Sequence, residues 1–335
     1  MFEDKNLLIT GGTGSLGQAL TKRLLEYDVK TIRILSRNES KQVEMQSKFD
    51  DPRLRFLVGD IRDQTRLLRA TEGVDLVFHA AALKHVPLIE SNPSEAIKTN
   101  VLGSENLIIA CTKNKVKKVV GIGTDKAVSP LNTYGATKLL MEKLFTNAVN
   151  EYSADEYDTR FLALRYGNVV ASSGSVIPLF IDQLKNKEKL TITDPNMTRF
   201  TITMNQAIDF ILDSTSQSVR SEVFVPKLQS YKIIDLVQAL EELLGEGKHE
   251  LINARPGEKS HELLINKYEI KFTKDLGDKF VILNPQIFSD SNKAHTEVLE
   301  TYCDFPDASF EEEYSSDKSP LLSVPELKMI LKNYI

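Results

Sequence analysis

Short apolar runs alternate with helical patterns along the first half of the chain. The runs at 6–10, 31–35, 54–58, 75–78, 118–122 and 161–166 read as strands, and helices are expected at about 15–26 and 133–151. The strands are separated by roughly 15 to 40 residues, which is the spacing of β-α-β units. The pattern predicts an α/β fold with a Rossmann-type, doubly wound parallel sheet and ligands at the carboxyl ends of its strands.

The pattern changes after about Gly167, where the periodic segments become shorter. We therefore expect a nucleotide-binding Rossmann domain at 1–166 and, at 167–335, mainly a smaller α/β substrate-binding lobe. The chain of this second half can cross back to the first domain. The segment 309–318 is rich in Glu and Ser and is predicted to lie on the surface.

Composition narrows the class of protein. The 335 residues suffice for one large domain with an appended lobe, and the net charge of -5 lacks the basic excess expected of a nucleic-acid-binding surface. No run of 18 apolar residues occurs, so we expect no membrane span. The N-terminus lacks the pattern of a signal peptide. With only two cysteines, Cys111 and Cys303, the chain is typical of a reducing cytoplasm.

A glycine-rich turn follows the first predicted strand and opens the first helix. Its glycines permit a tight turn and let backbone N–H groups reach a pyrophosphate at the helix N-terminus. Such a turn is a weak signal alone, but the strand–turn–helix context favours a dinucleotide site. The predicted contacts are Gly11, Thr13, Gly14, Ser15, Leu16 and Gly17.

The end of the second strand selects the nucleotide. An acidic residue there favours NAD, whereas Arg37 and Lys41 suit a 2′-phosphate and so predict NADP. The alternative is that both are solvated surface cations. Further cofactor contacts are expected at Ser36, Asn38, Asp60, Ile61, Ala80, Ala81, Tyr134 and Lys138.

Tyr134 and Lys138 lie four residues apart and share one face of the predicted helix. The pair resembles the acid/base pair of the short-chain dehydrogenase/reductase superfamily. That resemblance implies that Lys138 lowers the pKa of Tyr134 and that the phenolate takes a hydroxyl proton as hydride leaves for nicotinamide. The expected Ser or Thr, here Thr124, is followed by Asp125 and Lys126. These two groups suggest chemistry beyond hydride transfer, and a loop ion pair is the alternative.

Longer motifs resemble those of the inverting UDP-N-acetylglucosamine 4,6-dehydratases of the pseudaminic acid pathway type. The most specific are Thr-Asp-Lys-Ala at 124–127 and Arg-Pro-Gly-Glu-Lys at 255–259. Other matching stretches are 10–15, 81–87, 134–138, 165–170, 197–200, 261–262 and 314–317. The chain departs from the pattern at Leu83, where Met is more usual, and across 264–310, whose role stays open.

The resemblance implies a catalytic cycle in which NADP is tightly bound and recycled. Thr124 and Tyr134 would hold the sugar 4-OH, and Tyr134 would take its proton. Lys126 is the expected base for the C5 proton and Asp125 the expected acid for the 6-OH. A base Lys must be neutral, and we expect burial, Lys138 and the nicotinamide ring to lower the pKa of Lys126.

Substrate contacts also follow from the resemblance. Asn168 is expected at the diphosphate, and Arg199 in a uridine pocket, although a buried ion pair with Glu258 is an alternative for Arg199. The full set is Lys84, Asn168, Val176, Thr193, Arg199, Arg255 and Glu258. The five histidines do not form a metal set, so no metal is expected, and His249 and His295 are predicted on the surface.

The predicted function is the conversion of UDP-N-acetylglucosamine into UDP-2-acetamido-2,6-dideoxy-L-arabino-hexos-4-ulose, for nonulosonic acid or surface glycan biosynthesis. Relatives of this kind form homo-oligomers, often hexamers. A UDP-sugar 4-epimerase would use the same Tyr134 and Lys138 and stays open. A non-catalytic NADP-sensing protein is a third reading, although such proteins commonly lose this pair. Inversion or retention at C5, the final glycan and the oligomeric state are also open.

Overall fold

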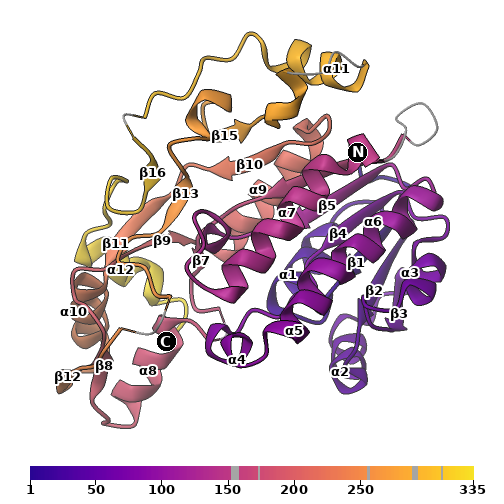
Figure 1. Cartoon of the computed structure of the whole chain (residues 1–335). Helices are drawn as coiled ribbons and strands as arrows, with labels where there is room; N and C mark the ends of the chain where they lie inside the picture. Colours follow the sequence, from indigo (N-terminus) through magenta and orange to yellow (C-terminus); the bar gives the residue numbers. More distant parts are fainter. Residues whose placement is uncertain (152–157, 173, 255–256, 289–292, 311) are drawn as a thin grey trace.

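The computed structural model describes residues 1–151, 158–172, 174–254, 257–288, 293–310 and 312–335 (Figure 1). In these residues the largest sheet has nine strands, in the order β14-β15-β10-β6-β5-β4-β1-β2-β3. Its parallel strands are β1 (Asn6–Thr10), β2 (Thr31–Ser36), β3 (Leu54–Val58), β4 (Leu76–His79), β5 (Lys118–Ile122), β6 (Arg160–Leu164) and β10 (Val223–Pro226). The predicted doubly wound parallel sheet is therefore confirmed.

Both faces of this sheet are covered by helices. In β1, Leu7 and Ile9 enter the core on one face, and Leu8 enters the core on the other. Burial on both faces explains why the strands are continuous apolar runs rather than alternating ones. One face carries α1 (Ser15–Leu24), α2 (Glu39–Phe49) and α9 (Met204–Gln217), and the other carries α3 (Gln64–Thr71), α6 (Gly103–Lys113) and α7 (Thr133–Glu151). None of the described helices is both long and apolar enough to cross a membrane.

The chain reverses its direction of winding between β1 and β4, which are neighbours in the sheet. The loops after β1, β4, β5 and β6 consequently meet at one edge, where ligands bind in folds of this type. The loop after β4 leads into α4 (Val86–Glu90), α5 (Pro93–Ala96) and a π-helix at Ile97–Leu102. The loop after β5 forms a single 3-10 turn, η2 (Asp125–Ala127).

The second half of the chain divides between the main sheet and a separate lobe (Figure 1). β10 joins the main sheet, and β15 (Lys279–Ile282) and β14 (Thr273–Asp275) extend it with antiparallel pairing. The segment 264–310, whose role the sequence left open, supplies these last two strands and α11 (Lys293–Tyr302).

The lobe has its own apolar core, formed by α8 (Val176–Lys185), α10 (Ile233–Leu244) and α12 (Val324–Leu331) around Leu190 and Ile192. The α12 helix begins with a capping box of Ser323 and Glu326. The lobe strands are β7 (Asn168–Val169), β8 (Leu190–Ile192), β9 (Thr198–Ile202), β11 (Gln229–Lys232), β12 (His249–Leu251), β13 (Leu263–Ile265) and β16 (Tyr314–Ser315).

One prediction of surface position is wrong in part and another is wrong. Within 309–318, Ser309, Glu312, Asp317 and Lys318 are exposed as predicted. Tyr314, Ser315 and Ser316 are buried because β16 pairs with β13 and the Tyr314 hydroxyl bonds the backbone of Leu228. His295 is also buried, since it shares the inward face of α11 with Val298 and Tyr302 at helical spacing. Composition alone could not identify these inward faces.

Candidate active site

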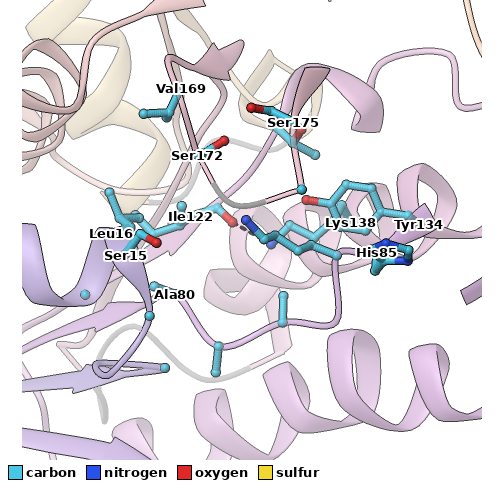
Figure 2. A pocket seen from close by; sticks show the side chains of 18 of the residues that line it. Ser15, Leu16, Ala80, His85, Ile122, Tyr134, Lys138, Val169, Ser172 and Ser175 are labelled. Atoms are coloured by element: carbon cyan, nitrogen blue, oxygen red, sulfur yellow. Dashed lines mark hydrogen bonds between the residues drawn. The ribbon is translucent and has the colours of Figure 1, made fainter. Parts of the chain in front are cut away.

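A cleft of about 790 Å³ lies at the carboxyl ends of the parallel strands, between the main sheet and the lobe. Figure 2 shows Ser15 and Leu16 of α1 on one side and Tyr134 and Lys138 of α7 on another. The predicted site residues that line it are Gly11, Thr13, Gly14, Ser15, Leu16, Gly17, Ser36, Arg37, Asn38, Lys41, Asp60, Ile61, Ala80, Ala81, Lys84, Thr124, Lys126, Tyr134, Lys138, Asn168, Val176 and Arg199.

The glycine-rich turn forms one end of the cleft. Gly11 has φ +68°, and a Cβ atom there would lie 2.7 Å from the backbone nitrogen of Ala81. Gly14 precedes the first turn of α1 and brings no capping side chain, so the N–H groups of that turn face the cleft unshielded. This close-fitting turn at a helix N-terminus fits the pyrophosphate of a dinucleotide.

Two cations lie at the far end of this nucleotide region. Arg37 and Lys41 line the cleft, and the Arg37 side chain is 54% exposed. Its Nη1 atom lies 3.8 Å from Asp60 Oδ2, a separation that leaves the guanidinium free to turn toward an anion. Asn38 caps α2 by accepting a hydrogen bond from the backbone N–H of Lys41, at 2.9 Å.

The start of α7 sits directly on the turn that carries Lys126. A Cβ atom at Gly135 would lie only 2.1 Å from the Lys126 carbonyl oxygen, so a residue without a side chain is required there. This contact places Tyr134 beside Thr124, whose hydroxyl donates to Asp125 Oδ1 at 2.8 Å. Burial raises the pKa of Tyr134, while the neighbouring Lys126 partly lowers it.

Lys138 differs from its expected arrangement. Its Nζ atom donates to the carbonyl of Ile122 and to Met141 Sδ, and burial lowers the pKa of Lys138 to about 8. The expectation that Lys138 lowers the pKa of Tyr134 is not met in this arrangement, because the ammonium is directed at the end of β5. Both side chains still line the same cleft (Figure 2).

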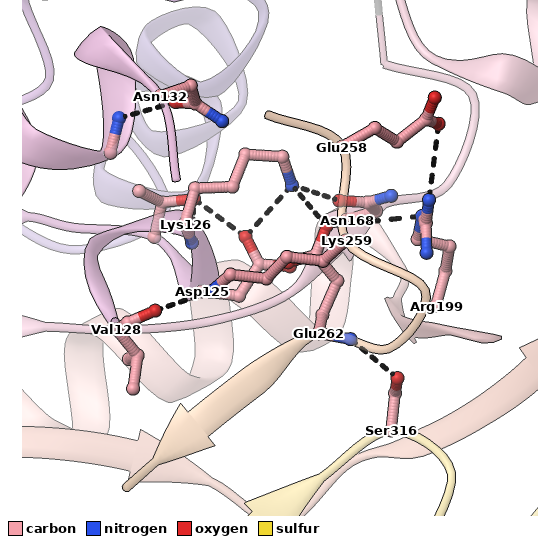
Figure 3. A network of polar contacts seen from close by, with 12 residues as sticks. Asp125, Lys126, Val128, Asn132, Asn168, Arg199, Glu258, Lys259, Glu262 and Ser316 are labelled. Carbon is pink, nitrogen blue, oxygen red and sulfur yellow. Dashed lines mark hydrogen bonds and ion pairs between the residues drawn. The ribbon is translucent and has the colours of Figure 1, made fainter. Parts of the chain in front are cut away.

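Figure 3 shows a cluster of Asp125, Lys126 and Glu262, here called the carboxylate–lysine cluster. Asp125 and Lys126 of this cluster are neighbours of Tyr134. Lys126 Nζ lies 3.1 Å from Asp125 Oδ1 and 3.4 Å from Glu262 Oε1. The same ammonium donates to Asn168 Oδ1 at 3.2 Å. Asn168, expected at a diphosphate, is therefore a contact of Lys126. The carboxyl groups of Asp125 and Glu262 are buried, whereas the Lys126 side chain is 25% exposed to the cleft.

The pKa of Lys126 was expected to be lowered, and the structure corrects this expectation. Burial alone would lower the pKa of Lys126, but Asp125 and Glu262 outweigh it and raise the pKa above its usual value. Burial raises the pKa of Asp125, and the charge of Glu262 adds to that effect. Burial would likewise raise the pKa of Glu262, but Lys126 and Arg199 lower it. Lys126 is therefore a stable ammonium in this arrangement, and the raised pKa of Asp125 favours the protonated form of its carboxyl group.

The remaining predicted substrate residues are spread around the lobe side of the cleft. Arg199 lines it and lies 3.3 Å from Glu258 Oε1, so the ion pair weighed from the sequence is present. In the described part of the chain, Thr193, Glu258 and the buried Asp125 lie outside the cleft lining. Arg255 falls outside the described residues. Burial lowers the pKa of Lys84, which follows β4.

Several cleft residues were not given a role from the sequence. Glu262 lies in the matching stretch 261–262, close to the Arg-Pro-Gly-Glu-Lys motif at 255–259. That position was a usable signal. His85 also lies in a matching motif and lines the cleft near Lys138 (Figure 2). Ser172 and Ser175 follow β7 in a loop with no helical or strand period, so no spacing signal could have found them.

Comparison with known proteins identifies similar chains. A profile of the family described as polysaccharide biosynthesis protein matches residues 7–284. A UDP-N-acetylglucosamine 4,6-dehydratase (inverting) of Campylobacter jejuni is 47% identical over 86% of this chain and 85% of its own length. A UDP-glucose 4-epimerase of Rickettsia felis is 43% identical over 99% of this chain and 97% of its own. The X-ray structure of Pen from Bacillus thuringiensis superimposes with a TM-score of 0.88, at 38% identity, over 99% of both chains.

Proposed function

The chain belongs to the polysaccharide biosynthesis protein family, and we propose that it is an NADP-dependent UDP-N-acetylglucosamine 4,6-dehydratase that inverts C5. The observation that carries this proposal is the ion pair of the buried Asp125 and the partly exposed Lys126, 3.1 Å apart, with Lys126 and Tyr134 both lining the cleft. Oxidation at C4 needs Tyr134, whereas the removal of water needs a further base and a further acid. The pair supplies both.

The cofactor would lie along the glycine-rich turn, with its pyrophosphate at the N-terminus of α1 and its 2′-phosphate at Arg37 and Lys41. When bound, NADP accepts hydride from C4 of the sugar and returns hydride to C6. Tight binding and recycling follow from this use, because one turnover leaves the cofactor unchanged. Lys138 would reach the ribose by turning from the Ile122 carbonyl.

The first step assigned to the chain is removal of the 4-OH proton. Thr124 and Tyr134 are neighbours and both line the cleft, so both can hold the sugar 4-OH. Tyr134 accepts that proton as a phenolate. Since burial raises the pKa of Tyr134, the phenolate needs the cations of Lys126 and the bound cofactor nearby.

The second step uses a proton that Asp125 and Lys126 share. Their ion pair and its neutral tautomer contain the same number of protons. Transfer across the 3.1 Å contact makes Lys126 a free amine and Asp125 a carboxylic acid at once. Lys126 then takes the C5 proton, Asp125 protonates the 6-OH as it leaves as water, and the ion pair is restored. This tautomer reconciles a base role for Lys126 with its raised pKa.

Inversion requires that a proton reach C5 on the face opposite Lys126, which gives the L-arabino product. Entry of the product into nonulosonic acid or surface glycan biosynthesis, a cytoplasmic location and assembly into homo-oligomers stay predictions. A UDP-sugar 4-epimerase is the second candidate, because a relative with that name matches 99% of this chain. An epimerase has no use for the proton shared by Asp125 and Lys126.

A turnover experiment separates these candidates. Incubated with UDP-N-acetylglucosamine and NADP+, the protein is expected to yield a product lighter by one water, with no net NADPH. In D2O, deuterium is expected at C5, and NMR would give the L-arabino configuration. A product of unchanged mass would favour the epimerase, and stoichiometric NADPH would favour a simple dehydrogenase. A D-xylo product would leave dehydration standing and reject inversion.

Cofactor choice is tested by Arg37→Asp. We expect NADP+ binding to weaken by about 2–3 kcal/mol, with little change for NAD+, because a charge-assisted contact to the 2′-phosphate becomes repulsive. Titration of both cofactors by fluorescence or calorimetry would measure this difference. Arg62→Asp is the matched control, because Arg62 also pairs with Asp60 but lies outside the described cleft lining. Equal losses for NADP+ and NAD+ would make Arg37 a surface residue.

A further inference from the structure

Glu262 is a carboxylate near the catalytic residues of the cleft that the proposed mechanism does not use. Its side chain is 5% exposed, lines the cleft, and lies 3.4 Å from Lys126 Nζ through Oε1. Its other oxygen, Oε2, is buried and has no hydrogen-bond partner among the described residues. A buried carboxylate is costly unless a charge compensates it, so its place beside Lys126 calls for a role.

The backbone holds Glu262 in this place from two sides. Its N–H donates to Ser316 Oγ at 2.9 Å, and its carbonyl accepts from the N–H of Ser316 at 2.9 Å. Ser316 Oγ also shares a 2.6 Å hydrogen bond with Thr198 Oγ1 of β9. Ser316, the residue directly after β16, therefore fixes the position of a carboxylate that faces the turn after β5.

A second set of hydrogen bonds joins the loop before Glu262 to the turn that carries Lys126. Lys259 Nζ donates to the carbonyl of Val128 (Figure 3). Asn132 donates to the carbonyl of Gly257 at 3.0 Å. Arg199, which lines the cleft, lies 4.0 Å from Glu262 Oε1. The Glu262 carboxylate thus sits between two cations, Lys126 and Arg199.

We propose that Glu262 is a positioning residue of the proton-transfer reaction: it holds the Lys126 amine against Asp125 and sets the pH range in which that pair carries a single proton. The inference rests on the proposed dehydration. With one shared proton the pair can become an acid and a base together. With two protons the base is lost, and with none the acid is lost.

The direction of the effect follows from charge. Glu262 raises the pKa of Lys126 and also raises that of Asp125, because a negative charge favours the protonated form of both neighbours. Removing the charge lowers both values. The acid limb of the activity profile reports Asp125 and the alkaline limb reports Lys126, so both limbs move to lower pH. The other titratable groups that face the cluster are Tyr134 of α7, Arg199 of β9, Tyr231 of β11 and Lys259.

The test is the pH dependence of kcat/KM for water loss from UDP-N-acetylglucosamine, in the full chain with NADP+. In Glu262→Gln we expect both limbs to shift to lower pH by at least about one unit, from loss of a charge 3.4 Å from Lys126 Nζ. In Glu262→Asp, which keeps the charge but shortens the side chain, we expect smaller shifts and a lower kcat with KM little changed.

Glu258→Gln is the matched control. It removes a carboxylate that contacts Arg199 at 3.3 Å, and we expect a changed KM with both limbs in place. If Glu262→Gln folds and keeps both limbs of the wild type, the inference is overturned. Wild-type kcat in Glu262→Asp would also overturn it, including where the Gln variant fails to fold. Absence of water loss in the wild type would instead reject the proposed function, and this inference with it.

Discussion

Lys126→Met is expected to abolish the loss of water, by at least about 10³-fold, because the variant has no amine to take the C5 proton. Oxidation at C4 depends on Tyr134 and Thr124, so part of it should survive as enzyme-bound NADPH, visible by its absorbance. Met has a similar length and fills the same space, and the described Asn168 contact is lost with the ammonium. Undiminished water loss in this variant would show that the role given to Lys126 is wrong.

Asp125→Asn removes the proposed acid and leaves the proposed base, Lys126, in place. The amide cannot protonate the 6-OH, so water loss should fall by about 10²–10⁴-fold. The amide also cannot take the proton of Lys126, but loss of the Asp125 charge, which raises the pKa of Lys126, leaves part of Lys126 as a free amine at alkaline pH. This amine would exchange the C5 proton of the oxidised sugar, and mass spectrometry in D2O at alkaline pH should find deuterium in recovered substrate. Lys126→Met should show no such exchange. If both variants exchange equally, another group is the base.

The sequence was sufficient to predict the elements whose local pattern is complete. The strands at 6–10, 54–58 and 118–122 match β1, β3 and β5 to the residue, and 133–151 matches α7. The glycine-rich turn and the pair Tyr134 and Lys138 were also found, since turn geometry and helical spacing act over a few residues. Each of these side chains lines the cleft.

Contacts between distant segments could not be predicted in this way. The pKa of Lys126 was expected to fall, and it rises because of the adjacent Asp125 and of Glu262, which is more than a hundred residues away in the sequence but lies 3.4 Å from Lys126 Nζ. The strand predicted at 161–166 ends as β6 at Leu164, and the next residue, Arg165, turns into the core. Contacts between segments that are distant in the sequence depend on tertiary packing, and hydrophobic periodicity carries no information about them.

Arg165 is the clearest example of a residue that joins segments distant in the sequence. Its side chain is 1% exposed and bonds Glu142 of α7, also 1% exposed, through two short contacts of 2.6 and 2.7 Å. It also bonds Glu269, in the segment 264–310, at 2.6 and 2.9 Å. This arginine therefore joins the end of β6 to the helix that carries Tyr134 and to a segment whose role the sequence left open.

Arg165→Met is expected to lower the free energy of unfolding by about 3–5 kcal/mol, because two carboxylates lose their buried cation. The urea midpoint at pH 7 would measure the loss. Arg160→Met, five residues earlier in the chain, is the matched control: its pairs with Asp158 and Glu297 are partly exposed, so the change should cost less than about 1 kcal/mol. Equal losses in the two variants would contradict the assignment of Arg165 as a buried junction.

Because Asn168 follows Arg165 by three residues and bonds Lys126, loosening this junction should also lower the rate of water loss in molecules that remain folded.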